Sequence, residues 1–196
     1  MSDINEAVLD ELFRTARSHH WFTRQPVEQS TLEAVYDLMK WGPTSMNCCP
    51  ARIHFCISQQ ARDRLSALSM DGNKEKIASA PVAAIFANDA AFYDRLPALF
   101  PPVPTAREMF ANNQTSAQAT AMRNGSLQGG YFIIAARALG LGVGPISGFN
   151  NAAVDAEFFA GTTLKSNFLC VLGYPDHSRT LPRQARLAFK DACRIL

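Results

Sequence analysis

The longest regular pattern in the chain runs from Thr115 to Leu139 and contains no proline. Alanine, glutamine, leucine, methionine and arginine dominate this stretch, and this composition predicts a long, mostly buried helix. Gly125, Gly129 and Gly130 would each weaken such a helix by roughly 1 kcal/mol relative to alanine. We therefore expect another helix or a ligand to approach the helix closely at these glycines.

A glycine-rich segment, Gly140 to Phe149, follows the predicted helix. It superficially resembles the dinucleotide-binding pattern G-x-G-x-x-G, but Pro145 or Ser147 stands where the third glycine is required. The segment also ends a helix, whereas that pattern follows a strand and begins a helix. Two interpretations stay open: a helix end followed by a turn, or a backbone wall whose N–H groups approach a flat ligand.

Shorter patterns predict the other elements of a single domain over residues 1–196. Apolar residues at three- and four-residue steps predict helices, and alternating or short apolar runs predict strands. The expected helices cover residues 3–17, 30–41, 59–68 and 151–159, and the expected strands cover residues 53–57, 82–86 and 168–172. Ser30 to Glu33 has the spacing of a capping box at the start of the second helix. A proline-rich insertion at residues 97–104 predicts an exposed loop.

Charge and cysteine content exclude several classes of protein. The formal net charge is +2, whereas nucleic-acid-binding domains usually carry a strongly basic face, so we expect no nucleic-acid partner. The five cysteines have no regular spacing, and we find neither a signal peptide nor a long apolar run. These features favour a soluble, reduced, cytoplasmic protein without a membrane partner or a metal site. Basic residues are concentrated in the tail, residues 179–196.

The segment from Pro43 to Pro50 cannot continue a helix and is rich in side chains that bind backbone or ligand. Thr44, Ser45 and Asn47 offer hydroxyl and amide groups that suit the oxygens of a phosphate or a polyol. The same residue types are also ordinary in turns. The segment is therefore a candidate binding loop rather than an established one.

Three further groups of residues have ordinary structural interpretations. We expect the adjacent Cys48 and Cys49 to be buried thiols. His19 and His20 point in different directions on any regular element, so we expect them to form hydrogen bonds rather than to ligate a metal together. Residues 73–76 are typical of a solvated surface turn.

In their order along the chain, these segments resemble the nitroreductase family of flavin enzymes. Arg17-Ser18-His19 resembles the family's first flavin-binding motif, and the segment from Pro43 to Pro50 resembles the second. Asn73 and Lys76 match an Asn-x-x-Lys pair that meets the flavin in some members. The most specific match is the end of the long helix followed by Pro145-Ile146-Ser147-Gly148-Phe149. The resemblance covers nearly the whole chain.

The resemblance implies an α+β fold in which helices flank a central mixed sheet. It also implies an intertwined homodimer with two FMN sites at the interface. The tail lies where the family places cations that bind phosphate. It has too few apolar residues to form a core of its own, so we expect it to embrace a partner.

Roles for individual residues follow from the same resemblance. Arginines would neutralise the FMN phosphate, polar side chains would bind the ribityl chain and the ring, and backbone N–H groups of the glycine turn would polarise the flavin edge. The implied cofactor-binding residues are Arg17, Ser18, His19, Pro43, Thr44, Ser45, Asn47, Asn73, Lys76, Pro145, Ile146, Ser147, Gly148, Arg183 and Arg186. No side chain is assigned as catalytic, because flavin N5 itself carries the hydride.

Within the family, the resemblance is to the malonic semialdehyde reductase branch. The segments that carry it are residues 40–45, 92–97, 144–149 and 164–167. It implies a ping-pong reaction in which NAD(P)H reduces FMN and malonic semialdehyde then takes the hydride to give 3-hydroxypropionate. Trp21, Cys49 and Ala51 depart from the wider family, which leaves the substrate open among aldehydes, nitro compounds and quinones. The alternatives are a broad-specificity NAD(P)H nitroreductase or quinone reductase and a non-catalytic flavin-binding protein.

Overall fold

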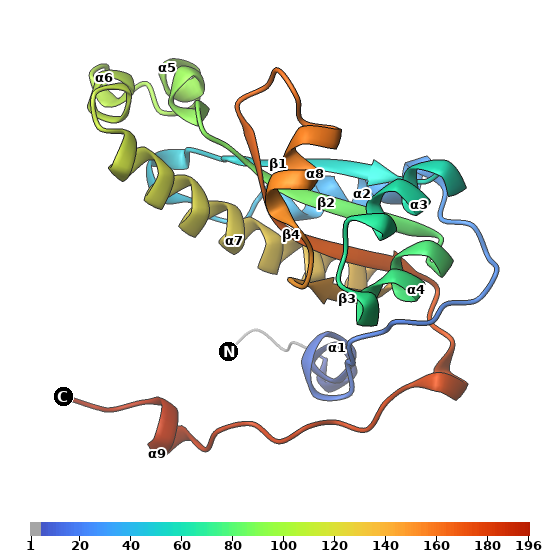
Figure 1. Cartoon of the computed structure of the whole chain (residues 1–196). Coiled ribbons are helices and arrows are strands. Elements are labelled where there is room, and N and C mark those ends of the chain that lie inside the picture. Colours follow the sequence, from blue (N-terminus) through green and yellow to red (C-terminus); the bar gives the residue numbers. More distant parts are fainter. Residues whose placement is uncertain (1–4) are drawn as a thin grey trace.

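A computed structural model describes residues 5–196, and at its centre lies a four-stranded sheet with helices on both faces (Figure 1). The strands are β1 (Ala51–Cys56), β2 (Val82–Asp89), β3 (Gly142–Ile146) and β4 (Leu164–Gly173), in the order β1-β2-β4-β3. The α+β class is confirmed. The expected mixed sheet needs a correction, because all three strand pairings are antiparallel. Within the described residues, parallel pairing is limited to one bridge between Ser18 and Val143.

β2 is the interior strand that the sequence predicted, and it is buried on both faces. Successive side chains of a strand point to opposite faces of its sheet. One hydrophobic cluster accordingly contains Val82, Ala84 and Phe86, and the other contains Ala83, Ile85 and Ala87. The alternation of β4 divides its residues between the same two clusters.

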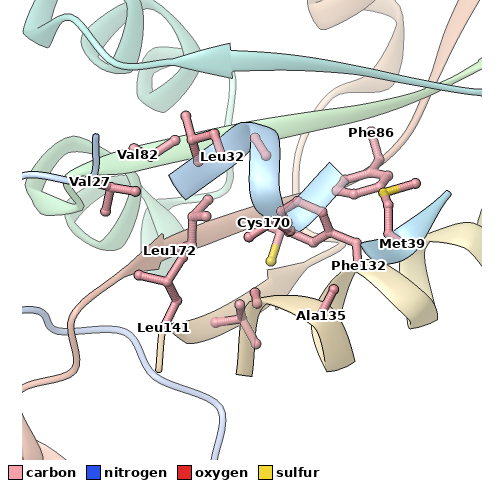
Figure 2. Close-up of a cluster of buried hydrophobic side chains, with 14 residues drawn as sticks. Val27, Leu32, Met39, Val82, Phe86, Phe132, Ala135, Leu141, Cys170 and Leu172 are labelled. Carbon is pink, nitrogen blue, oxygen red and sulfur yellow. The ribbon is translucent and has the colours of Figure 1, made fainter. Parts of the chain in front are cut away.

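The first cluster lies between the sheet and two helices, α2 (Gln29–Met39) and α7 (Gln114–Ala138). Figure 2 shows side chains from these elements pointing toward one another, with the Phe86 and Phe132 ring centroids 4.8 Å apart. The predicted long helix is therefore present, but only one of its faces is buried. Its other face exposes Met122, Leu127 and Tyr131.

Two of the three glycines of α7, Gly125 and Gly129, face side chains of the sheet. A Cβ on Gly125 would lie 1.8 Å from Asn88 Oδ1, and one on Gly129 would lie 2.4 Å from the Phe168 ring. Gly130 has nothing within 4 Å. The helix ends before Gly140, whose φ of +76° is a conformation that glycine adopts at little cost.

Two segments predicted as turns have regular structure. Gly142–Ile146 forms strand β3 against β4, so the turn expected after the long helix is wrong there. Residues 73–76 lie inside α4 (Asp71–Ser79), so the surface turn expected there is wrong as well. In both cases the local sequence is polar or glycine-rich, and tertiary packing determines the conformation.

The second cluster covers the opposite face of the sheet with α3 (Gln59–Ala67), α4 and α8 (Asn151–Phe158), as Figure 1 shows. A third, smaller cluster forms at the N-terminal end of α7. It involves η2 (Ser45–Asn47), η3 (Phe92–Arg95), α5 (Leu96–Leu99) and α6 (Ala106–Ala111). The proline-rich insertion is thus only partly a loop, because Pro97 lies in the first turn of α5 and Leu96 is buried.

The first described helix and the segment after β4 lie beside the sheet domain rather than inside it (Figure 1). The predicted N-terminal helix is formed by α1 (Glu6–Leu9) and the π-helix η1 (Asp10–Arg14), while residues 3 and 4 lie outside the described residues. After β4, the short helix η4 (His177–Arg179) leads into an arm, residues 180–196, that includes α9 (Phe189–Ala192). We call residues 180–196 the C-terminal arm. Most of its residues are exposed.

Two details of the helices bear on the sequence predictions. The capping box is wrong, because α2 begins earlier, with Glu28 as its N-cap, and Ser30 lies inside the helix. Among the described residues, no helix is both long enough and apolar enough to cross a membrane.

Candidate functional site

Four predicted site residues, two from each of two segments that lie far apart in the sequence, meet at one cavity. Arg17, Ser18, Arg183 and Arg186 line a cavity of about 380 Å³ between the segment after η1 and the C-terminal arm. Arg137, from the last turn of α7, lines it too. Guanidinium groups form strong, charge-assisted hydrogen bonds to phosphate, so this arrangement suits a phosphate group. We call this cavity the arginine cavity.

Backbone carbonyls, rather than carboxylates, hold these arginines. Arg183 Nη2 donates to the carbonyls of Ala16 at 2.7 Å and Phe13 at 3.2 Å, close to the C-terminus of η1. Arg17 donates to the carbonyl of Thr15 at 2.6 Å, and Arg186 donates to two carbonyls of the arm at 3.0 Å. No ion pair in the described part of the chain includes an arginine of this cavity. Their positive charges therefore remain available to an anion.

His20 also lines the arginine cavity, and its Nδ1 atom has no hydrogen-bond partner among the described residues. Its Nδ1 atom is buried and unpaired, as are Arg137 Nε and Thr180 Oγ1. The three atoms belong to residues lining the arginine cavity or the neighbouring one. Because buried polar atoms in proteins are nearly always paired, these atoms indicate a place for a polar ligand or ordered water. Burial, followed by the positive charge of Lys76, lowers the pKa of His20.

His19 lies in the neighbouring cavity, which measures about 590 Å³ and also contains His177. The two imidazole rings meet edge to face with centroids 5.8 Å apart. Burial and then the charge of His177 lower the pKa of His19. His19 is absent from the lining of the arginine cavity, and consecutive residues of an extended segment point to opposite sides. The structure therefore separates its side chain from the arginines.

The Asn73 and Lys76 pair is joined to the turn after β3. Asn73 Nδ2 donates to the carbonyl of Gly148 at 3.1 Å, and Lys76 Nζ donates to Asn73 Oδ1 at 3.2 Å. No hydrogen bond within the described residues is donated by the backbone amides of Ser147 and Gly148. Two adjacent free amides beside a lysine can stabilise developing negative charge on a ligand.

Pro145 and Ile146, which end β3, differ in what they can offer a ligand. Pro145 is exposed, whereas the Ile146 side chain is buried in the second cluster. Ile146 can therefore contribute only backbone atoms to the site. The glycines before them do not form an open wall, because a Cβ on Gly144 would lie 2.2 Å from the carbonyl oxygen of His19.

The predicted loop from Pro43 to Asn47 lies elsewhere in the chain. The Ser45 amide donates to Asn124 Oδ1 at 2.8 Å, and Asn47 Nδ2 donates to the carbonyl of Leu99 at 2.9 Å. Asn124 and Arg137 are separated by roughly 20 Å along α7, at about 1.5 Å of rise per residue. One chain therefore does not bring the loop and the arginine cavity together.

Sequence reasoning missed two cavity residues, His20 and Arg137. His20 could have been found from the alternation of side chains after Ser18, and Arg137 from its place as the cation that interrupts an apolar run. Of the two cysteines expected to be buried, Cys48 is buried and Cys49 only partly so. Burial raises the pKa of the Cys48 thiol to about 11, so it is not a reactive thiolate. The described residues contain no group of three or more His, Cys, Asp or Glu side chains that could hold a metal ion.

Comparison with known proteins identifies the family. Residues 13–174 match the nitroreductase family. The chain belongs to this family, as the sequence motifs predicted, and it is an oxidoreductase of the nitroreductase type. HadB of Ralstonia pickettii, named as an NADH dehydrogenase/NAD(P)H nitroreductase, is 51% identical over 189 residues, which are 95% of this chain and 96% of HadB. A Caulobacter vibrioides protein with the same activity name is 48% identical over the full length of both chains.

Solved structures of other proteins share the fold of this chain, although their sequence identity to it is low. The nitroreductase YdfN of Bacillus subtilis has a TM-score of 0.86 and 16% identity, covering 98% of this chain and 100% of YdfN. An Exiguobacterium sibiricum nitroreductase solved in complex with FMN has a TM-score of 0.84 and 18% identity, covering 95% and 96% of the two chains. These scores confirm the predicted nitroreductase fold.

Proposed function

We propose that this chain is an FMN-dependent NAD(P)H oxidoreductase that reduces malonic semialdehyde to 3-hydroxypropionate. The observation that carries the flavin assignment is the arginine cavity, where Arg17 and the arm residues Arg183 and Arg186 converge without a carboxylate partner from residues 5–196. The Exiguobacterium neighbour was solved with FMN, and the relatives above are named for NAD(P)H, which supports both cofactors. Bound FMN would supply the hydride chemistry, which the side chains of the chain cannot perform.

The residues of the chain would bind and orient this cofactor. The arginines and Ser18 would hold its phosphate, and the unpaired Nδ1 of His20 would gain a polar partner beside it. The free amides of Ser147 and Gly148 would face the redox-active edge of the ring, where negative charge develops during hydride transfer. Asn73 would fix the turn that carries these amides, through its hydrogen bond to Gly148.

A homodimer would bring the loop that contains Thr44, Ser45 and Asn47 to the arginine cavity of the other copy. This arrangement accounts for the distance between the two groups within one chain. It also accounts for apolar side chains that are exposed on α2 and α7, two helices that pack against each other. These side chains are Tyr36 and Leu38 on α2 and Met122, Leu127 and Tyr131 on α7, and the exposed Trp41 lies two residues after α2. Exposed apolar groups gathered on two neighbouring helices are typical of a protein interface.

The C-terminal arm would complete the dimer by lying on the partner. Exposed apolar residues of the arm include Leu181, Leu187, Phe189 and Ile195. A groove of about 1,060 Å³ runs beside β1, an edge strand of the sheet, and contains Ile53, Phe55 and the acidic residues Glu33 and Asp37. Arg52 and Arg95 line the same groove, so its charge is mixed. The unpaired strand edge and the apolar residues suit the apolar part of an arm from a second copy. The five cysteines are all free thiols, which is consistent with a cytoplasmic protein.

The alternative is a broad-specificity NAD(P)H nitroreductase or quinone reductase. The names of the relatives favour it, because they mention nitroreductase activity and no aldehyde substrate. The proposed catalytic surface is the same in both cases, and only the electron acceptor differs.

The proposal is tested with purified protein. We expect a yellow protein with flavin absorbance bands, and we expect denaturation to release FMN. NAD(P)H should bleach the bands without oxygen, and malonic semialdehyde should restore them faster than nitrofurans or quinones do. Faster reoxidation by nitrofurans or quinones would favour the alternative, and persistent yellow colour with NAD(P)H would indicate a non-catalytic flavin-binding protein. A colourless protein that takes up no added FMN would contradict both flavin-enzyme assignments.

A further inference from the structure

The loop that contains Thr44, Ser45 and Asn47 has an unusual backbone. Met46, Asn47 and Cys49 have φ values of 51°, 48° and 39°, in the left-handed region that residues other than glycine rarely adopt. Backbone strain of this kind persists only where the surrounding structure holds it, and it is concentrated at functional sites. The loop therefore needs restraints from outside its own sequence.

Two neighbouring side chains of α7 supply such restraints at the two ends of the loop. Asn124 Oδ1 accepts a hydrogen bond from the Ser45 amide at 2.8 Å, and Gln128 Oε1 accepts one from the Ala51 amide at 2.9 Å. Asn124 is 2% exposed and Gln128 is 5% exposed, so water cannot easily replace either acceptor. The two residues lie one helical turn apart, on the same face of α7.

The helix that carries them is a rigid support. Asn124 Nδ2 donates to the carbonyl of Thr120 at 2.9 Å, which fixes the orientation of the amide. Gly125 and Gly129, which follow Asn124 and Gln128 in the sequence, bring α7 into close contact with the side chains of Asn88 and Phe168 on the sheet. A site is most precise when its residues are held by packed side chains on regular elements.

We propose that Asn124 and Gln128 are positioning residues of the cofactor site. They hold the strained loop from both ends, so that Thr44, Ser45 and Asn47 meet the flavin bound in the arginine cavity of the partner. This inference rests on the proposed function. It adds two buried residues that act on the site through the loop.

The test removes each hydrogen-bond acceptor by a substitution that keeps the side chain at nearly the same size. The variants are Asn124→Leu and Gln128→Met, and Gln128→Glu retains an acceptor oxygen. Gln118→Met is the matched control, because Gln118 is exposed on the same helix. The first measurement is the alkylation rate of Cys48 in FMN-free protein, followed by peptide mass spectrometry. Cys48 is 1% exposed at the end of the loop, and the fully buried Cys170 reports global unfolding.

We expect Asn124→Leu and Gln128→Met to raise Cys48 alkylation about tenfold or more, as the loss of one buried hydrogen bond implies, with Cys170 unchanged. FMN affinity should fall by a similar factor, and Gln128→Glu should restore both values toward those of the wild type. Unchanged Cys48 alkylation in both variants would overturn the restraint, and faster alkylation with unchanged FMN affinity would overturn the positioning role. Failure of the wild type to bind FMN would overturn the proposed function and this role together, and the alkylation rates would still show whether α7 restrains the loop.

Discussion

At the scale of single residues, the most informative feature is a group of positive charges that have no ion-pair partner in the described part of the chain. Arg17, Arg137, Arg183 and Arg186 line one cavity, and within the described residues their side chains donate hydrogen bonds to backbone carbonyls. Elsewhere in the chain, arginines such as Arg52 and Arg64 pair with carboxylates. Surface ion pairs contribute little free energy, so their absence here costs the fold little. The same absence leaves the cavity suited to an anion.

The first prediction concerns Arg186, one of the two arm arginines that line this cavity. Arg186→Ala should weaken FMN binding by about 1.5–3 kcal/mol, the free energy typical of a hydrogen bond to a charged group. Arg194→Ala is the control, because Arg194 belongs to the same arm but does not line the cavity. Titration of apoprotein with FMN, followed by flavin fluorescence, gives both affinities. Equal affinities for Arg186→Ala and the wild type would remove Arg186 from the site.

A second residue-scale prediction concerns pH. Burial lowers the pKa of His19, and His177, Arg137, His20 and Arg17 lower it further, so the folded state favours the neutral ring. Above the unfolded pKa of about 6.5 the ring is neutral in both states and pH has no effect through it. As pH falls below that value, the unfolded state takes up the proton first, and the free energy of unfolding decreases until the folded pKa is passed.

His19→Gln should therefore reduce the loss of thermal stability between about pH 7.5 and pH 5.5. The unfolding midpoint of FMN-free protein, measured by circular dichroism at both pH values, checks this expectation. An identical pH dependence in the variant and the wild type would show that His19 does not contribute to it.

At the scale of elements, patterns that are local in sequence were predictable and pairings between distant segments were not. The long helix was predicted within one residue of α7 at each end, because its helix-forming composition without proline and the glycine after it are local signals. Strand β3 was not predicted, because Gly142, Gly144 and Pro145 have low strand propensity and only pairing with β4 makes them a strand. The N-terminus of α2 was also misplaced, because its N-cap residue gives no capping signal in the sequence. Its N-cap, Glu28, makes no side-chain capping bond.

The candidate site also has features that local sequence predicts and features that depend on the fold. The residues of each motif were predictable from their local pattern, but the sequence could not show that His19 and His20 line different cavities. Nor could it show that the loop around Ser45 lies far from Arg17 in the same chain. Both facts depend on how α7 and the sheet separate the segments. The reason for the α7 glycines is likewise tertiary, since Asn88 and Phe168 occupy the space that side chains would need.

The close contact at Gly129 gives a prediction for α7 as an element. Gly129→Ala should lower the free energy of unfolding by about 1–3 kcal/mol, because the new methyl group would push the Phe168 ring away from its stacked position on Phe86. Gly72→Ala is the control, since Gly72 lies in α4 with nothing within 4 Å and should be neutral or slightly stabilising. Urea unfolding gives both values. A Gly129→Ala chain as stable as the wild type would mean that the helix can move away from the sheet at no cost.

At the scale of the whole molecule, the two halves of the predicted flavin site lie at opposite ends of α7. Thr44 and Asn47 belong to one end, and the arginine cavity belongs to the other. The same chain exposes apolar residues on α2 and α7 and extends an arm that its own core does not use (Figure 1). A homodimer in which each flavin contacts both copies accounts for all of these features. We therefore propose that each cofactor site needs residues from two chains.

Complementation between two inactive variants tests this claim most directly. One chain carries Arg17→Ala and Arg186→Ala in the cavity, and the other carries Thr44→Ala and Asn47→Ala in the loop. Each variant alone should bind FMN poorly. The heterodimer, isolated through two different tags, should contain one intact site and bind about one FMN, half the content of the wild-type dimer. A heterodimer that binds no more FMN than either variant homodimer would contradict a site shared between two chains.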